Sequence, residues 1–361
     1  MIEYESLAKV NQPYFFELRE AANRVIESGW YILGKEVINF EKEFANYLNS
    51  PHCIGVANGL DAMILSLKSL NLPQGSEVIV PSNTYIATIL AVIQAGCTPV
   101  LVEPDIQTYN INPSKIVEAI SKDTKAILIV HLYGKMCDMD PIVQLCHQHQ
   151  LYLLEDCAQS QGAKYKDQHS GTFGDFGCFS FYPTKNLGAY GDAGAVTCKD
   201  DYLALQIRRY RNYGSDIKYH NEILGHNSRL DEIQAALLIV KLKYLDQINN
   251  HKRRLAKTYH DYLKSDFILP HLDNDYFDIY HIFNIRHNKR NDLRKFLLEN
   301  GIKTEIHYPI PPHQQKALLG FFEQKRFPIS EEIHQTTISL PCSSSHTIDE
   351  IEHVVEVLNK F

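Results

Sequence analysis

The sequence has no Cys-x-x-Cys pair, no internal repeat, no low-complexity segment and no excess of positive charge. Its eight cysteines are scattered and lie mostly in apolar stretches, as is typical of reduced cysteines that fill a core. The formal net charge of −7 argues against a general nucleic-acid binder and against binding to an anionic membrane surface. We therefore predict a reduced protein with no metal site that binds neither nucleic acid nor a membrane.

The chain also shows no signal peptide and no long apolar run. Residues Met1–Glu5 have neither a basic start nor an apolar core. The most apolar long stretch, Ile86–Val102, contains Gln94, Gly96 and Pro99, whereas a membrane-spanning helix needs about 20 apolar residues without such breaks. The expectation is a soluble, cytoplasmic protein.

The composition is that of a packed globular enzyme. The 361 residues are 44% hydrophobic and 11% aromatic, and their number fits one large domain with a smaller one. From residue 53 to residue 198, short apolar stretches alternate with helical patterns, which predicts a mostly parallel sheet covered by helices on both faces. The predicted strands are Cys53–Ala57, Glu77–Pro81, Val100–Glu103, Lys125–Val130, Leu151–Glu155, Gly177–Phe181 and Gly194–Cys198. The predicted helices are Leu60–Leu70, Thr84–Ala95, Pro113–Ser121 and Asp140–Gln148.

The C-terminal third has a different pattern. Ser228–Asn249 carries an apolar stripe at helical spacing, and the charge-rich run Asn250–Arg254 suggests a change of unit. We therefore predict a large domain over residues 1–245 and a small α/β domain over residues 246–361. In the small domain we predict strands at Ile282–Arg286 and Ile338–Leu340, and helices at Leu293–Asn300 and Ile348–Leu358.

The most informative group of residues follows two of the predicted strands. Asp156 stands at the end of one strand, and Ser180 and then Lys185 stand at the end of another. Pyridoxal phosphate (PLP) needs a Schiff-base amine, an anion for its pyridine nitrogen and a donor for its phosphate, and these three residues supply them. A lysine alone is usually a solvated surface residue, and an acid after a strand is often a helix cap. Their order on these elements favours the cofactor.

Two further segments fit the same cofactor. Asn58–Ala62 joins a strand to a helix, and Gly59 lets the backbone approach a phosphate at the first helical turn. Tyr85 follows another strand and could stack on the pyridine ring. The alternatives are a tight turn capped by Asn58 and an aromatic residue that is plain packing.

These residues belong to segments that occur in one order in a known family. With them, the chain from about Gly29 to its end resembles the nucleotide-sugar aminotransferases of the DegT/DnrJ/EryC1/StrS group. Those enzymes are fold-type I PLP-dependent transferases similar to aspartate aminotransferase, so the resemblance implies a mostly parallel central sheet with helices on both faces and a smaller C-terminal α/β domain. The matching segments are Gly29–Gly34, Asn58–Ala62, Pro81–Tyr85, Glu155–Gln159, Ser180–Asn186, Gly225–Glu232 and His307–Pro311.

The resemblance implies roles for residues around the cofactor ring. Lys185 matches the catalytic lysine that forms the Schiff base. Asp156 matches the partner of the pyridine nitrogen, and Gln159 matches the residue near the ring hydroxyl. Tyr85 matches the aromatic residue that stacks on the ring.

The resemblance also implies how the phosphate is held. Gly59, Leu60 and Ser180 match the phosphate cradle. Asn227 matches an asparagine that reaches the phosphate of the neighbouring subunit's cofactor. The resemblance therefore implies a homodimer with two shared active sites.

The substrate prediction is more specific. Lys185 distinguishes this chain from relatives that carry histidine there and perform dehydration, so amino transfer is the better interpretation. Val80–Thr88 and His131–Gly134 look closest to enzymes that act at C3 of dTDP-3-keto-6-deoxyhexoses. Those enzymes use L-glutamate, release 2-oxoglutarate and make dTDP-3-amino-3,6-dideoxyhexoses for surface polysaccharides such as lipopolysaccharide O-antigen. The predicted substrate-binding residues are Tyr31, Tyr182, His307 and Tyr308.

Several alternatives stay open from the sequence. His307–Pro311 is also interpretable as a turn stiffened by its prolines. Spacing and composition do not separate transfer at C3 from transfer at C4 of a UDP- or dTDP-4-keto-6-deoxy sugar. The galacto or gluco epimer and the residues that hold the nucleotide are equally undecided. A non-catalytic regulatory protein on the same fold is the remaining hypothesis.

Overall fold

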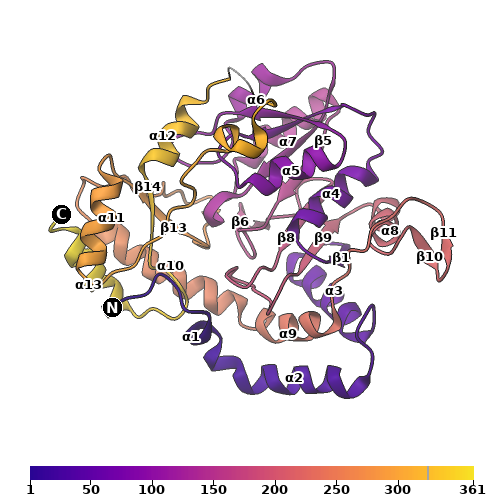
Figure 1. The fold of residues 1–361 in the computed structure, drawn as a ribbon, viewed down its shortest axis with the longest axis horizontal. Helices are drawn as coiled ribbons and strands as arrows, with labels where there is room; N and C mark the ends of the chain where they lie inside the picture. Colours follow the sequence, from indigo (N-terminus) through magenta and orange to yellow (C-terminus); the bar gives the residue numbers. More distant parts are fainter. Residues whose placement is uncertain (323–324) are drawn as a thin grey trace.

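A seven-stranded sheet forms the centre of the protein (Figure 1). The computed structural model describes residues 1–322 and 325–361. The strand order is β1-β9-β8-β5-β4-β2-β3; the neighbours from β8 to β3 run parallel, whereas β9 runs antiparallel to β1 and β8. The predicted mostly parallel sheet is confirmed. Its strands are β1 (His52–Val56), β2 (Glu77–Pro81), β3 (Thr98–Val102), β4 (Thr124–Val130), β5 (Tyr152–Asp156), β8 (Phe176–Ser180) and β9 (Gly194–Cys198).

Helices cover both faces of this sheet because the strands carry apolar side chains on both sides. In β4, Ala126 and Leu128 pack in one core cluster and Ile127 and Ile129 pack in another. The first cluster includes α4 (Gly59–Ser69), α5 (Ile86–Gln94) and α8 (Asp201–Tyr210). The opposite face is covered by α6 (Pro113–Ala119) and α7 (Met139–His149), and further along by α3 (Lys35–Leu48) and α9 (Glu232–Leu242).

The C-terminal part has its own apolar core. β13 (Phe283–Arg286) and β14 (Thr337–Leu340) form an antiparallel pair that packs with α10 (Leu245–Tyr262), α11 (Arg290–Glu299) and α13 (Ile348–Leu358). The first residues of the chain lie against this part, since Ile2 pairs with Ile302. The domain boundary near residue 245 stays a prediction.

The structure corrects one helix prediction. The expected helix over Ser228–Asn249 is two helices, α9 and α10, separated at Lys243 and Tyr244. The charged run Asn250–Arg254 lies inside α10. Its residues follow the helical period, so Lys252 is buried while Arg254 is exposed.

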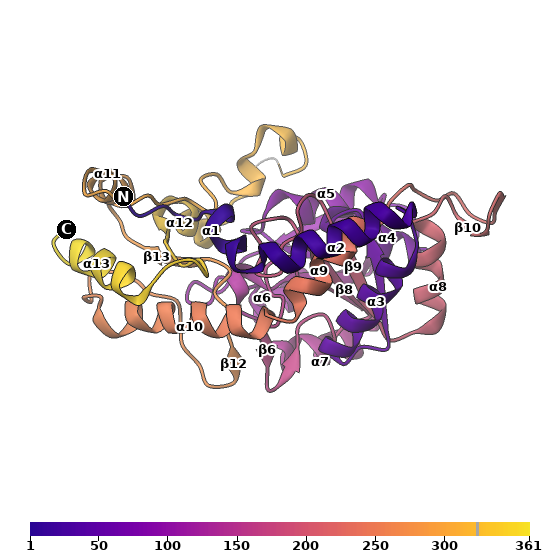
Figure 2. The ribbon, with the colours of Figure 1, turned by 90° about the horizontal axis from the view of Figure 1, so that it is seen from below.

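The N-terminal helices, α8 and the short elements were not predicted; the two- or three-residue strands carry no periodic signal. Figure 2 shows the β10–β11 hairpin projecting away from the body of the molecule. Across residues 1–322 and 325–361, no helix combines the length and the apolar character needed to cross a membrane. The remaining elements are α1 (Leu7–Asn11), α2 (Phe15–Ser28), β6 (Lys164–Tyr165), β7 (Gln168–His169), β10 (Ser215–Ile217), β11 (His220–Asn221), β12 (Tyr276–Phe277), α12 (Pro328–Thr336) and four short 3₁₀ turns at Gln12–Tyr14, Leu132–Gly134, Pro312–Gln314 and Lys316–Leu318.

Candidate active site

Two adjacent parallel strands carry the acid and the lysine to the same edge of the sheet. β5 ends at Asp156 and β8 ends at Ser180, and the two strands pair directly. Lys185 follows in a turn closed by a hydrogen bond from its backbone N–H to the carbonyl oxygen of Tyr182 at 2.8 Å. The carboxyl ends of parallel strands are a common place for ligand sites in open α/β sheets.

The Asp156 carboxylate is buried and held by two donors. Oδ2 accepts from the Thr88 hydroxyl at 2.8 Å, and Oδ1 accepts from the Ala158 N–H at 3.1 Å. Burial raises the pKa of Asp156, while these hydrogen bonds and the nearby Lys185 oppose that rise. A cationic ring nitrogen against this carboxylate would offset the cost of its burial, so Asp156 fits the pyridine nitrogen of PLP.

The Lys185 amine is enclosed beside His281. Its Nζ lies 3.4 Å from Nε2 of His281. Burial lowers the pKa of Lys185 to about 8, and the charges of Asp156 and Glu5 oppose the shift. A lysine with such a pKa is partly neutral near physiological pH, which both imine formation and proton transfer require.

The turn from β1 to α4 forms a cradle. The backbone N–H groups of Gly59 and Leu60 have no hydrogen-bond partner among the described residues, whereas Asn58 caps the helix by accepting from the Asp61 N–H at 2.8 Å. A Cβ added to Gly59 would lie 2.7 Å from Cβ of Ser180, so only glycine fits against that serine. Free amides at a helix start beside a serine hydroxyl fit a phosphate.

A second group of side chains gathers around Tyr308. Its hydroxyl accepts a hydrogen bond from Nε2 of Gln159 at 2.9 Å, and its ring lies 5.2 Å from the Tyr85 ring between centroids. Nδ1 of His307 lies 2.9 Å from the Ser339 hydroxyl. Burial lowers the pKa of His307 to about 4, so its imidazole is neutral at physiological pH. The structure thus brings Gln159, Tyr85 and Tyr308 together, with His307 adjacent in the chain.

Three further predicted residues are exposed. Tyr182 is exposed directly after β8. Tyr31 is exposed between α2 and α3, where its hydroxyl donates to the Ile26 carbonyl at 3.2 Å. Asn227 is exposed before α9, and its neighbour Ser228 accepts from the N–H of Ala57 at 3.2 Å. Within the described part of one chain, no hydrogen bond joins Tyr31 or Asn227 to Lys185 or Asp156.

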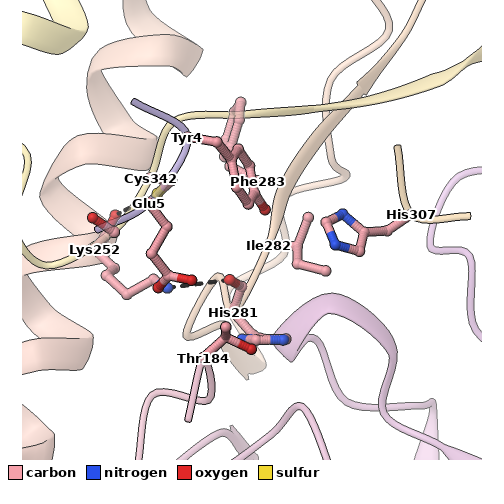
Figure 3. Close-up of a pocket in the computed structure, with 10 residues that line it drawn as sticks. Tyr4, Glu5, Thr184, Lys252, His281, Ile282, Phe283, His307 and Cys342 are labelled. Atoms are coloured by element: carbon pink, nitrogen blue, oxygen red, sulfur yellow. Dashed lines mark hydrogen bonds between the residues drawn. The ribbon is translucent and has the colours of Figure 1, made fainter. Parts of the chain in front are cut away.

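The sequence interpretation missed other residues around Lys185. Thr88 supports Asp156, and a cavity beside Lys185 is lined by Glu5 from the N-terminal segment, Lys252 from α10 and His281 from the turn before β13 (Figure 3). Thr88 stood within a segment that was matched to relatives, so its position was a usable signal. Glu5, Lys252 and His281 carry no motif, and only the tertiary fold brings them together.

Glu155, the neighbour of Asp156, anchors a loop under the site. Its carboxylate accepts hydrogen bonds from the N–H groups of Gly171, Phe173 and Gly174, each at 2.8 Å. It also lies 2.9 Å from Nε2 of buried His131. Together with Cys157 these are residue types that bind metals, and the histidine and the carboxylate already make hydrogen bonds here.

The fold and this site define a pyridoxal-phosphate-dependent aminotransferase: a strand-end acid, a half-buried lysine and an anion cradle meet at the edge of a largely parallel sheet. The chain belongs to the DegT/DnrJ/EryC1/StrS aminotransferase family, which matches residues 16–359. It is therefore a sugar aminotransferase, and the non-catalytic hypothesis is wrong.

The chain is similar to named proteins over its full length. It is 51% identical to the dTDP-3-amino-3,6-dideoxy-alpha-D-galactopyranose transaminase of Aneurinibacillus thermoaerophilus, covering 100% of this chain and 99% of that one. The solved structure of DesV from Streptomyces venezuelae is 40% identical, with a TM-score of 0.96 over 98% of this chain and 96% of DesV. NtdA from Bacillus subtilis, solved with bound cofactor PMP, is 31% identical, with a TM-score of 0.92 over 98% of this chain and 83% of NtdA.

Proposed function

We propose that the protein transfers the amino group of L-glutamate to the C3 ketone of a dTDP-3-keto-6-deoxyhexose and releases 2-oxoglutarate. The product is a dTDP-3-amino-3,6-dideoxyhexose, destined for surface polysaccharide such as O-antigen. The observation that carries this assignment is the 51% identity, along the whole chain, to a transaminase named for a dTDP-3-amino-3,6-dideoxy sugar. The reaction belongs in the cytoplasm, where nucleotide sugars are made.

The proposed cofactor residues lie at or near the strand ends and the turn from β1 to α4. Lys185 holds PLP, Asp156 faces its ring nitrogen and Gln159 lies near the ring hydroxyl. Tyr85 stacks on the ring. The phosphate is held by the amides of Gly59 and Leu60 and by the Ser180 hydroxyl. The free amides and the close approach at Gly59 support this arrangement.

The chemistry is divided between the cofactor and the chain. When bound, PLP supplies an electron sink for breaking the C–H bond next to the transferred nitrogen. Nζ of Lys185 takes up the proton lost from the α-carbon of glutamate, and it returns a proton when the amino sugar forms. The depressed pKa of Lys185, about 8, supports both directions of transfer near neutral pH. The Thr88 hydroxyl keeps the Asp156 carboxylate oriented.

We assign binding of the keto sugar, on what we call the sugar side of the site, to polar side chains that are exposed or neutral. Tyr182, His307 and Tyr308 border the keto sugar, and Tyr31 contributes from the segment before α3. A neutral His307 imidazole can exchange one hydrogen bond with a sugar hydroxyl, as donor or as acceptor. A neutral imidazole suits an uncharged sugar better than an imidazolium cation would. The exposure of Tyr182 leaves its ring free to contact a ligand.

The protein is proposed to act as a homodimer in which Asn227 reaches the phosphate of its partner's cofactor. Its exposure, and the exposed side chains of nearby Tyr213 and Leu224, support such an interface. The two-unit division, residues 1–245 and 246–361, is proposed with it.

Mixing Lys185→Ala with Asn227→Asp subunits should restore about a quarter of wild-type activity, because half of random dimers then hold one intact site. No restoration after verified subunit exchange would contradict a shared site.

A substrate panel tests the sugar assignment. Purified protein is incubated with L-glutamate and either a dTDP-3-keto-6-deoxyhexose or a UDP- or dTDP-4-keto-6-deoxy sugar, and the product is read by NMR. We expect nitrogen at C3 and no product from the 4-keto sugars. Amination at C4 would overturn the regiochemistry and leave the aminotransferase assignment intact.

A further inference from the structure

The amine of Lys185 has one side-chain hydrogen-bond contact among the described residues, and that contact is to His281. The two nitrogens, Nζ and Nε2, lie 3.4 Å apart. Figure 3 shows the His281 ring beside Thr184, in the cavity that Glu5 and Lys252 also line. His281 belongs to no segment that the sequence singled out, and the reaction scheme above does not use it.

A buried network fixes the backbone on both sides of this contact. Asn186, the neighbour of Lys185, donates through Nδ2 to Oδ1 of Asn249 at 2.8 Å. Nζ of Lys252 donates to Oδ1 of Asn186 at 3.0 Å and to the carbonyl oxygen of His281 at 3.1 Å. Asn249 and Lys252 both lie on α10, so one helix fixes the turn that carries Lys185 relative to the turn that carries His281.

The surroundings keep the His281 imidazole uncharged. Burial and the charges of Lys185 and Lys252 hold the pKa of His281 well below its usual value. Its Nδ1 is buried and has no hydrogen-bond partner among the described residues. A neutral imidazole has one acceptor nitrogen, which can be the Nε2 that faces Lys185. The other titratable groups around this space are Tyr4, Glu5, Asp156, His307 and Cys342.

We propose that His281 is a positioning residue that accepts a hydrogen bond from the Lys185 amine and so keeps that amine aimed at the reacting carbon. The inference rests on Lys185 being the acid–base group of the proposed function. A lysine side chain is long and rotamer-rich, and an amine without this acceptor would sample orientations in which no proton can pass. His281 itself takes no proton in this scheme.

The first test measures Lys185 in the full-length chain freed of cofactor, by competitive acylation with acetic anhydride across pH and peptide mass spectrometry. Removal of the His281 acceptor destabilises the charged ammonium form of Lys185 more than its neutral amine form. His281→Leu should therefore lower the apparent pKa of Lys185 by about 0.5 to 1 unit. His281→Gln should keep the wild-type value, because its amide oxygen can accept. His307→Leu is the matched control, since His307 has no hydrogen bond to Lys185, and it should leave the value unchanged.

The second test follows the glutamate half-reaction of the holoenzyme. His281→Leu should lower kcat about tenfold with KM changed by less than about twofold, and His281→Gln should recover to within about threefold of wild type. Should the leucine variant fail to fold, His281→Asn replaces it, being polar but too short to reach Lys185. An unchanged or raised Lys185 pKa in a folded variant, or a glutamine variant no better than leucine, overturns the proposal. Failure of borohydride to fix the cofactor at Lys185 in the wild type would instead refute the proposed function.

Discussion

The cofactor side and the sugar side of the site are built differently. On the cofactor side, Asp156 and Lys185 follow strands that are buried in the central sheet, and their side chains contact other buried groups. On the sugar side, Tyr31 and Tyr182 lie on connecting segments and are exposed. One chain therefore brings the acid and the lysine of the cofactor side together, whereas these residues of the proposed sugar side stay open to solvent.

The electrostatics follow the same division. Burial shifts the pKa of Lys185 downward and that of Asp156 upward, so these two groups titrate according to the fold around them. We therefore expect changes on the cofactor side to impair the chemistry, and changes on the sugar side to alter selectivity among sugars.

Removing the proposed catalytic amine should have the largest effect. Lys185→Ala should lower glutamate-dependent turnover by at least about 10⁴-fold, because both covalent attachment and proton transfer are lost. The matched control is Lys241→Met. Lys241 is also a lysine removed from solvent, its pKa is also lowered to about 8, and it donates to the Gly188 carbonyl at 2.7 Å. The control should keep borohydride trapping of cofactor at Lys185. Comparable losses in both variants would mean that burial of lysine, and not position 185, matters.

Neutralising the strand-end acid should have the next largest effect. Asp156→Asn should lower turnover about 10³-fold, because an amide cannot keep the ring nitrogen charged. Thr88→Val removes only the hydroxyl that donates to Oδ2 of Asp156 and should cost about tenfold. Steady-state kinetics with both variants checks this ranking, and a Thr88→Val enzyme as impaired as Asp156→Asn would contradict it.

The sequence predicted the parts of this site that follow strands and missed the parts that only packing assembles. Continuous apolar runs identified the strands, so the residues just after them, Asp156 and Lys185, were placed correctly at one sheet edge. His281 and Lys252 come from distant segments without a motif, and a hydrogen-bond network joins them to Lys185. Periodicity also cannot show where a helical stripe breaks, which is why α9 and α10 were predicted as one helix.

The enclosure of Lys185 should also affect the free energy of unfolding. Burial lowers the pKa of Lys185 from 10.5 to about 8, so between these values the unfolded chain binds more protons at this lysine and stability rises with pH. Below pH 8 the full cost of burying the charge is present. Cofactor-free Lys185→Met should thus be about 1–3 kcal/mol more stable than wild type at pH 7, with a smaller gain at pH 10. Urea unfolding at both pH values measures this; a gain that does not shrink would reject the charge explanation.

The smallest expected effect concerns the phosphate cradle. Gly59→Ala places a Cβ 2.7 Å from Cβ of Ser180 and 3.2 Å from its Cα, so the turn must move away from the position where its amides meet a phosphate. We expect the affinity for PLP to fall about tenfold, measured by absorbance titration of the cofactor-free chain. Gly191→Ala is the control, because its new Cβ would meet only the flexible end of Gln234, at 3.1 Å. Since neither substitution changes a charge, a loss confined to Gly59→Ala would attribute the affinity to backbone geometry, whereas equal affinities in both variants would remove Gly59 from the phosphate site.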